Sequence, residues 1–313
     1  MDKAIFVNGG AGRVLCAIPV LEKYCTEHPN TIIVSEAWGE LFLTSKELRD
    51  KSYMPHTKGL FEDKLKDRQI ITLEPYRVNE YYNQKCNLSQ AFDIELNQLQ
   101  EVPPALPMTI DLSKQSQVNG YNFVDSVKRQ MGKDKAILFQ PFGSTARVDG
   151  RFIIDSSGRS FELRDVLRTI EELNKFAAVI MMSSFPIPSD KDLGIAMPDN
   201  MDLVGWAGIT NAVDYVLSCD SVAQHFANAI GKPTTVVIGA TFPENISYPD
   251  NPNFKIMDLG KGRRVYSPLR ILQEMAHLSL IHISEPTRPE RIADGVGGVK
   301  KKRGGGGGGG GGG

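Results

Sequence analysis

The sequence predicts an α/β protein of two domains, each built around a parallel sheet, with a ligand cleft between them. Short apolar segments that end in small or polar residues alternate with segments of helical periodicity, and this alternation appears in both halves of the chain. The length of 313 residues suits two domains, because one domain spans roughly 100–200 residues. We place the domains at residues 1–125 and 126–278.

The first half opens with an apolar segment at residues 4–7, which predicts a strand. A glycine-rich turn follows at 9–12, then a segment with apolar residues at helical spacing, then a second strand at 31–34. Strand, turn, helix and strand form a βαβ unit, which predicts parallel strands. A further strand is expected at 70–73, and residues 76–99 are expected to be helical.

The second half repeats the pattern from residue 136 onward. Gly231 and Pro233 close one of its helices, because glycine favours the left-handed end of a helix and proline cannot continue it. We expect strands at 136–139, 177–182, 202–204 and 234–238, and helices at 161–175, 209–217 and 221–230.

Residues 279–313 differ from the rest of the chain in composition. They hold 13 of the 30 glycines and end in ten consecutive glycines. A glycine run has no side chain to bury and loses much conformational entropy when it is ordered. The string SLIHISEPTRPE resembles translated sequencing-adaptor read-through. We therefore expect a non-native, disordered tail and exclude it from the fold and the function.

The composition also excludes several classes of protein. The net charge of −1 lacks the basic excess of a nucleic-acid binder. No apolar run reaches the ~18 residues of a transmembrane helix, and the first residues lack the pattern of a secretory signal. The four cysteines fit no metal or redox spacing, and the histidines are too scattered for a zinc site. We therefore expect a cytoplasmic protein with reduced thiols and no metal.

The glycine turn after the first strand is the first candidate site, at Gly9, Gly10 and Gly12. Glycines between a strand and a helix let a ligand approach the backbone, and the start of the helix favours anions. Glu36 lies about 20 residues further on, as the acidic ribose contact of a dinucleotide site does. An NAD-dependent oxidoreductase is therefore one alternative, although the full glycine fingerprint is absent.

Two candidate sites follow strands of the second half. The loop after the strand at 136–139 carries Ser144, Thr145 and Arg147, and Arg159 lies downstream; hydroxyls and guanidinium groups suit a diphosphate. The second is the helix start at 220–225. Its first residues, Asp220 or Ser221, are expected to cap the helix, and His225, one turn in, lines a site or fills the core.

Several motifs of residues 1–278 occur together in one known family. With them, the chain resembles glycosyltransferase family 9, the lipopolysaccharide heptosyltransferase-like enzymes of GT-B fold. The amino-terminal strand, small-residue loop and Leu-Pro helix of the family match Phe6 to Leu21. The carboxy-terminal family signature Asp-Thr-Gly-x-x-His, followed by Gly-Lys-Pro and a strand, matches Asp220 to Gly239, with Ser221 for Thr and Val222 for Gly. Further matches are Phe139 to Thr145, Arg159 to Phe161 and Gly205 to Gly208.

The resemblance implies two Rossmann-like domains and the transfer of a sugar from a nucleotide-sugar to an acceptor hydroxyl, with inversion and without a metal or cofactor. It implies a donor, an ADP-sugar, in the second domain, and a glycan or glycolipid acceptor of surface-glycan or lipopolysaccharide assembly against the first. Such a protein is expected to be a monomer with a peripheral membrane contact. On this resemblance Ser144, Thr145 and Arg159 hold phosphate, and Asp220, Ser221 and His225 line the donor pocket.

One departure from the family concerns catalysis. The catalytic base of the family is an aspartate at the position of Arg13, and an arginine stays protonated and cannot act as a base. Three interpretations remain open. Another carboxylate, Glu36 or Glu244, serves as the base. Alternatively, Arg13 binds a charged acceptor or the donor phosphate. In the third interpretation the protein binds a nucleotide-sugar without turning it over.

Overall fold

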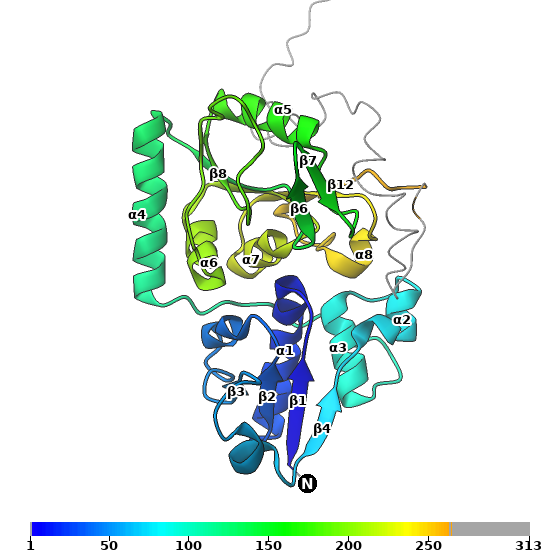
Figure 1. Ribbon diagram of the computed structural model, residues 1–313. Coiled ribbons are helices and arrows are strands. Elements are labelled where there is room, and N and C mark those ends of the chain that lie inside the picture. The colour runs from blue at the N-terminus through cyan, green and yellow to red at the C-terminus, as the bar shows by residue number, and fades with distance from the viewer. Residues whose placement is uncertain (1, 263, 265–313) are drawn as a thin grey trace, which may run out of the picture.

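The amino-terminal half of the computed structural model is a parallel sheet with strand order β3-β2-β1-β4, shown in blue and cyan in Figure 1. The structure describes residues 2–262 and 264. The strands are β1 (Lys3–Val7), β2 (Ile32–Ser35), β3 (Ser52–Tyr53) and β4 (Gln69–Thr72). Helix α1 (Ala11–Glu27) follows the glycine turn and buries its apolar face. The predicted βαβ unit and the strand near 70–73 are therefore confirmed.

The rest of this half is made of short helices. They are η1 (Gly39–Thr44), η2 (Phe61–Leu65), η3 (Pro75–Arg77), α2 (Asn79–Tyr82) and α3 (Leu88–Asn97). The segment expected to be one helical region is therefore divided. Asn87 begins a new helix, because its side chain accepts from Gln90 N at 2.9 Å while the Gln90 side chain accepts from Asn87 N at 3.0 Å.

The second half is a parallel sheet with order β12-β11-β10-β5-β8-β9. Its strands are β5 (Ala136–Gln140), β8 (Ala178–Met181), β9 (Ile195–Ala196), β10 (Tyr215–Cys219), β11 (Thr234–Ile238) and β12 (Phe254–Asp258). Its helices are α4 (Lys114–Met131), α5 (Leu163–Asn174), α6 (Leu203–Ala212), α7 (Val222–Ile230) and α8 (Pro243–Ile246). An antiparallel hairpin, β6 (Ala146–Asp149) with β7 (Phe152–Asp155), projects from the sheet.

Two of the predicted elements in this half are wrong. Residues 202–204 are not a strand, because the Asp202 side chain accepts from Gly205 N at 2.7 Å and caps the start of α6. The helix expected at 209–217 ends at Ala212, and β10 begins at Tyr215. The strand is buried between β5 and β11, and its nearly continuous apolar sequence does not separate it from a buried helix.

Helix α4 leads from the first half into the second and packs along α6. The two helices approach closely where glycines face each other: a Cβ on Gly120 would lie 2.2 Å from the Gly208 carbonyl oxygen. The predicted domain boundary at residue 125 lies inside α4, so the division into 1–125 and 126–278 stays a prediction.

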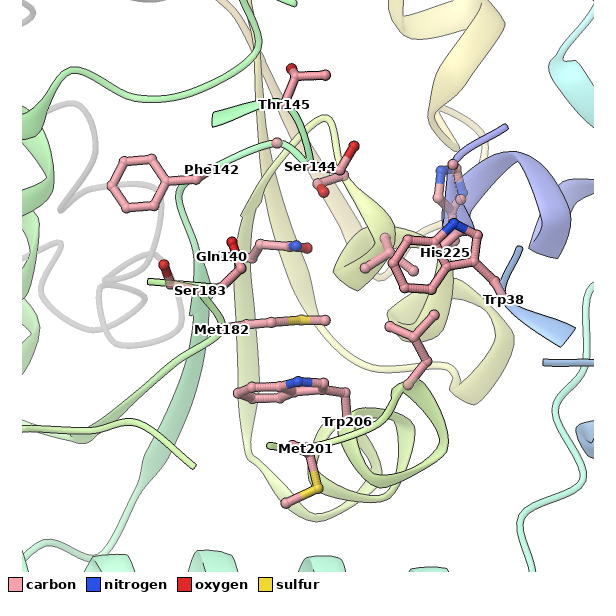
Figure 2. Close-up of a pocket in the computed structure, with 18 of the residues that line it drawn as sticks. Trp38, Gln140, Phe142, Ser144, Thr145, Met182, Ser183, Met201, Trp206 and His225 are labelled. Carbon is pink, nitrogen blue, oxygen red and sulfur yellow. The ribbon is translucent and has the colours of Figure 1, made fainter. Parts of the chain in front are cut away.

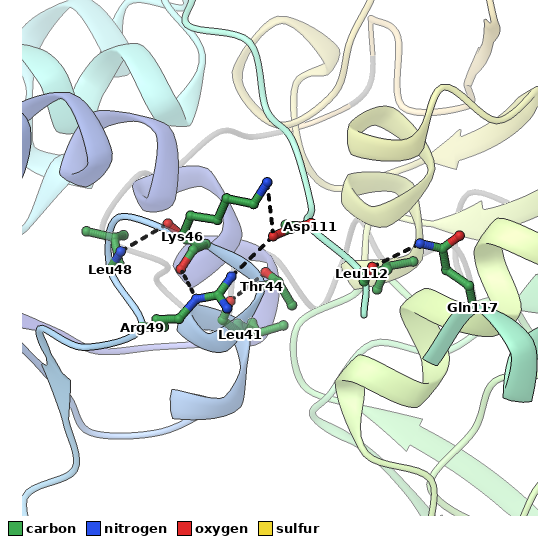
Figure 3. Close-up of polar contacts among 9 residues, drawn as sticks. Leu41, Thr44, Lys46, Leu48, Arg49, Asp111, Leu112 and Gln117 are labelled. Carbon is green, nitrogen blue, oxygen red and sulfur yellow. Dashed lines mark hydrogen bonds and ion pairs between the residues drawn. The ribbon is translucent and has the colours of Figure 1, made fainter. Parts of the chain in front are cut away.

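The segment before α4 is tied to the first half by Asp111 (Figure 3). Its carboxylate accepts from Arg49 Nη2 at 3.2 Å and lies 3.6 Å from Lys46 Nζ, and its backbone N–H donates to Thr44 O. On the other side of this anchor, Gln117 Nε2 donates to Leu112 O at the start of α4. The connection between the halves is therefore held at both ends.

Some expectations fall on residues that the structure does not describe. The predicted tail at 279–313 and the end of the second predicted domain lie outside residues 2–262 and 264. Within those residues, no helix combines the length and the apolar content needed to span a bilayer. The four cysteines are all buried and unpaired.

Candidate functional site

A cleft of about 880 Å³ opens between the two halves at the carboxyl ends of their strands. From the first half it is lined by the turn after β1, by the start of α1 and by η1. From the second half it is lined by the loops after β5, β8 and β10 and by the starts of α6 and α7. This is where parallel α/β folds place their ligands.

Arg159 is held at the cleft by a buried carboxylate. Asp155, at the end of β7, accepts six hydrogen bonds, from Thr145 Oγ1, from Arg159 N and from the N–H and hydroxyl groups of Ser157 and Ser160. Burial raises the pKa of Asp155, but these hydrogen bonds outweigh burial, so its pKa lies below the ordinary value. Asp155 therefore stays ionised and fixes the loop.

The guanidinium of Arg159 extends from this loop toward the start of α7. Its Nε donates to Ser157 Oγ at 3.0 Å, and its Nη1 donates to the Asp220 carbonyl oxygen at 3.4 Å. The hydroxyl hydrogen of Thr145 is used by Asp155, so Ser144 is the hydroxyl donor that this loop presents to the cleft.

The start of α7 is built differently from the predicted cap. Ser221 occupies the cap position, but its side chain accepts no capping hydrogen bond. The Gln140 side chain, at the end of β5, accepts from Ala223 N at 2.8 Å instead. The Asp220 carboxylate accepts from Gln224 Nε2 and Thr241 Oγ1, so it joins the first turn of α7 to the segment after β11. Remaining amides at the start of α7 suit an anion.

An apolar slot lies beside these polar groups. Figure 2 shows Met182, Trp206 and Met201 one below another beneath Gln140, with Phe142 and Ser183 to the left. Trp206 is only 6% exposed, so its ring forms a fixed wall. A slot of sulfur and aromatic groups with a few hydroxyls suits a flat heterocycle. The sequence indicated Trp206 only through its Gly-Trp-Ala-Gly context, and the two methionines not at all.

His225 lies on α7 at the floor of the cleft and packs against the glycine turn. A Cβ on Gly12 would lie 2.6 Å from His225 Cδ2, so only glycine allows this contact. His225 Nδ1 and Tyr248 Oη share a hydrogen bond of 2.7 Å, and Cys16 Sγ lies 3.7 Å from the same nitrogen. Burial lowers the pKa of His225 to about 4, so the ring is neutral at neutral pH.

Arg13 borders the cleft, but its charge is directed to the end of β4. Its Nη2 donates to Leu73 O at 2.7 Å, and its Nη1 lies 3.3 Å from Glu74 Oε1. The guanidinium also lies over the Tyr76 ring, 4.9 Å from the centroid. Gly9, at a φ of 95°, makes room for this side chain, because a Cβ there would lie 2.7 Å from Arg13 Cδ. Arg13 therefore joins α1 to β4.

The structure brings most of the predicted site residues together. The residues that line the cleft are Gly10, Gly12, Arg13, Ser144, Thr145, Arg159, Asp220, Ser221 and His225. Four others do not line it. Gly9 lies behind Arg13, Glu36 is exposed after β2, Arg147 is exposed on the hairpin, and Glu244 is exposed on α8. Neither carboxylate that the sequence offered as a base faces the cleft.

Some lining residues were not predicted. Trp38 and Glu40 line the first-half wall of the cleft, and Gln140 lies at its centre. Trp38 has a φ of 62°, which turns the chain into η1. No sequence signal pointed to Trp38 or Glu40, because the segment after β2 has no regular pattern.

No family model and no curated protein matches the chain. Solved structures are similar to it. The ADP-heptose lipopolysaccharide heptosyltransferase II of Escherichia coli is 11% identical, with a TM-score of 0.63 over 95% of this chain and 98% of that one. A family 9 glycosyltransferase from Veillonella parvula is 11% identical, with a TM-score of 0.58 over 95% and 96%. The iron-containing dodecameric glycosyltransferase TibC of E. coli is 12% identical, with a TM-score of 0.53 over 81% and 63%.

At identities of 11–12% the likeness concerns the fold. The first two alignments cover 95% of the chain and therefore include both of its parallel sheets. The predicted fold class is thereby confirmed, and so is the resemblance at the level of structure: the chain has the GT-B fold of heptosyltransferases and family 9 glycosyltransferases.

Proposed function

We propose that the protein is a glycosyltransferase that moves a sugar from an ADP-sugar to an acceptor hydroxyl, with inversion and without a metal. The acceptor is a glycan or glycolipid of surface-glycan or lipopolysaccharide assembly. The fold and the heptosyltransferases of similar structure support this proposal.

One observation carries the proposal: the cleft places anion-binding groups next to an apolar slot. Ser144, Arg159 and the start of α7 are suited to a diphosphate, and the slot between Met182 and Trp206 is suited to a nucleobase. The loops after β5, β8 and β10 of the second sheet carry Ser144, Met182 and the start of α7, whereas Arg159 follows the hairpin and Trp206 lies on α6. A nucleoside diphosphate bound there would direct its sugar toward the first-half wall.

The residues of the cleft would act on the leaving group. As the acceptor oxygen bonds to the anomeric carbon, the bond from that carbon to the phosphate oxygen breaks, and negative charge develops on the diphosphate. Arg159 is already fixed by Asp155 and Ser157, so it can stabilise this charge without reorganising. Attack from the face opposite the diphosphate inverts the anomeric configuration.

The dinucleotide alternative has less support. It rested on the glycine turn and Glu36, and Glu36 is exposed and does not line the cleft. It also assigns no role to Arg159 or to the start of α7. The interpretation as a binding protein without turnover shares the donor site, and only a turnover assay separates it from the transferase.

Calorimetric titration with ADP-, GDP-, UDP- and CMP-sugars and with NAD tests the proposal. We expect an ADP-sugar to bind and to raise the free energy of unfolding by about 2.7 kcal/mol at 100 times its Kd. Arg159→Met should weaken that binding by roughly 10- to 100-fold, the value of about one charged hydrogen bond. Arg151→Met, which removes an exposed arginine of the hairpin, is the matched control.

Release of ADP then separates a transferase from a binding protein, and EDTA should not slow it. Binding of NAD in preference to every nucleotide-sugar would contradict the proposal. An ADP-sugar that binds without ADP release, with any glycan acceptor or with water, would favour the protein that only binds.

A further inference from the structure

Resting on the proposed transfer, we propose that Glu40 is the general base that takes the proton from the acceptor hydroxyl. A sugar hydroxyl is a weak nucleophile, and a carboxylate beside it accelerates attack by accepting its proton as the new bond forms. The residue at the family base position, Arg13, remains protonated and is bonded to Leu73 O and Glu74. The base must therefore come from elsewhere in the cleft.

Among the described residues that line the cleft, four carry a carboxylate: Glu40, Asp199, Asp202 and Asp220. Two are already committed to the structure. The Asp220 carboxylate accepts from Gln224 Nε2 at 3.1 Å and from Thr241 Oγ1 at 2.9 Å, and only 6% of the residue is exposed. Asp202 accepts from Gly205 N at 2.7 Å as the cap of α6.

The remaining two carboxylates, of Asp199 and Glu40, lie on opposite walls of the cleft. Asp199 precedes α6 in the segment that also carries Met201, so it borders the slot for the nucleobase in the second half. Glu40 comes from η1, on the opposite wall. Inverting transfer requires the acceptor to approach the anomeric carbon from the side away from the diphosphate, and the base lies with the acceptor. With the diphosphate at Arg159, that side is the wall of Glu40.

Local geometry also suits Glu40. The left-handed turn at Trp38 begins η1, and η1 contacts α6 across the cleft. Glu40 is partly buried, and no hydrogen bond or ion pair to another described residue engages its carboxylate. It is therefore available to a ligand, unlike Glu74, which is paired with Arg13 and does not line the cleft.

His225 is the other titratable group that a base could use. Its Nδ1 is engaged by Tyr248 Oη, and its Nε2 edge is covered by Gly12, where a Cβ would lie 2.8 Å away. Only 5% of the residue is exposed, so an acceptor hydroxyl does not reach the ring. His225 therefore forms part of the floor rather than the proton acceptor.

The step balances without a further reactant. The O–H bond of the acceptor breaks, its proton passes to a Glu40 carboxylate oxygen, and the acceptor oxygen bonds to the anomeric carbon. The bond from that carbon to the diphosphate breaks, and its electron pair leaves with the nucleoside diphosphate. Protonated Glu40 then returns the proton to water.

The test is Glu40→Gln in the full chain, which keeps the size of the side chain and removes the base. Release of ADP from an ADP-sugar is followed with water as the acceptor, and donor Kd is measured by calorimetry. We expect kcat to fall by about 10²–10⁴-fold and Kd to change less than twofold. Glu40→Asp should restore part of kcat. Glu62→Gln, an exposed glutamate of the same half, is the matched control.

The outcomes separate the two proposals. If Glu40→Gln binds the donor normally and releases ADP at an undiminished rate, the proposed role of Glu40 is wrong and the proposed function is unaffected. The same holds if Asp199→Asn or Glu36→Gln abolishes release while Glu40→Gln does not. A wild-type protein that binds no nucleotide-sugar would overturn the proposed function, and the role of Glu40 with it. If the wild type binds the donor but releases no ADP, the role of Glu40 as a general base is also excluded.

Discussion

Arg13 offers a prediction that separates a structural role from a functional one. Arg13→Met keeps the buried stem of the side chain and removes the guanidinium. The variant loses the hydrogen bond to Leu73 O at 2.7 Å, the ion pair with Glu74 at 3.3 Å and the contact with the Tyr76 ring. What remains is an unpaired carbonyl at the end of β4.

The cost follows from these contacts. A hydrogen bond from a charged donor contributes about 1.5–3 kcal/mol, and a cation–π contact contributes about 0.5–1 kcal/mol. The ion pair adds little, because the Glu74 side chain is 37% exposed. We therefore expect Arg13→Met to lower the free energy of unfolding by about 2–4 kcal/mol.

Urea unfolding followed by circular dichroism measures this loss, and titration with an ADP-sugar measures any loss of affinity. Donor affinity should stay within about twofold, because the guanidinium faces β4. A double-mutant cycle with Glu74→Gln should show a small coupling of under about 1 kcal/mol. Unchanged stability together with a tenfold or larger loss of affinity would refute this assignment and return Arg13 to the ligand.

Three further predictions concern other parts of the molecule. Burial lowers the pKa of His225 from 6.5 to about 4, so between these pH values the unfolded chain takes up a proton that the folded chain does not. The free energy of unfolding should therefore fall by about 3 kcal/mol as the pH drops from 6.5 to 4. Urea titrations should show that His225→Gln loses this pH dependence. The lowered pKa of Asp155 means that its carboxylate stabilises the fold at neutral pH and loses this effect as the pH falls below about 4. Asp155→Asn should therefore be less stable than the wild type at pH 7. Calorimetry should also show that this variant binds the donor about tenfold more weakly. Gly120→Ala should lower the melting temperature, because the new methyl would lie 2.2 Å from Gly208 O. Gly132→Ala is the comparison variant, because a methyl there meets no neighbour and tests only the left-handed turn after α4.

Much of the fold was predictable because burial and periodicity coincide in it. The segments at 4–7, 136–139 and 234–238 are short, apolar and followed by a small or polar residue, and all are inner parallel strands. The region 202–217 was not predictable, because α6 and β10 are both apolar and are separated by only two residues. Distinguishing them required the cap at Asp202, which is visible only as a hydrogen bond.

The site was predictable where its residues follow strands. Ser144 and Asp220 were found in this way, because the ends of parallel strands converge at one edge. Arg159 was indicated instead by its place before a probable helix start and by the family resemblance. The function of a side chain within the cleft depends on tertiary partners that no local pattern records. Arg147 resembles Arg159 in sequence, yet it lies on the exposed hairpin, and only Arg159 is fixed by the Asp155 loop.

The two halves of the cleft differ in how firmly their residues are held, and this difference follows the proposed division of labour. On the second-half wall, Asp155 is hydrogen-bonded to Ser160 of its own loop, and Gln140 and Asp220 are hydrogen-bonded to the first turn of α7. The groups that would receive the diphosphate are therefore fixed before it arrives. On the first-half wall, Arg13 is withdrawn to β4, and Glu40 has no partner among the described residues. A base has to accept and release a proton in each cycle, so an unpaired carboxylate serves that step better than one held in an ion pair. The arginine at position 13 is therefore compatible with turnover, provided that the proton is taken by Glu40.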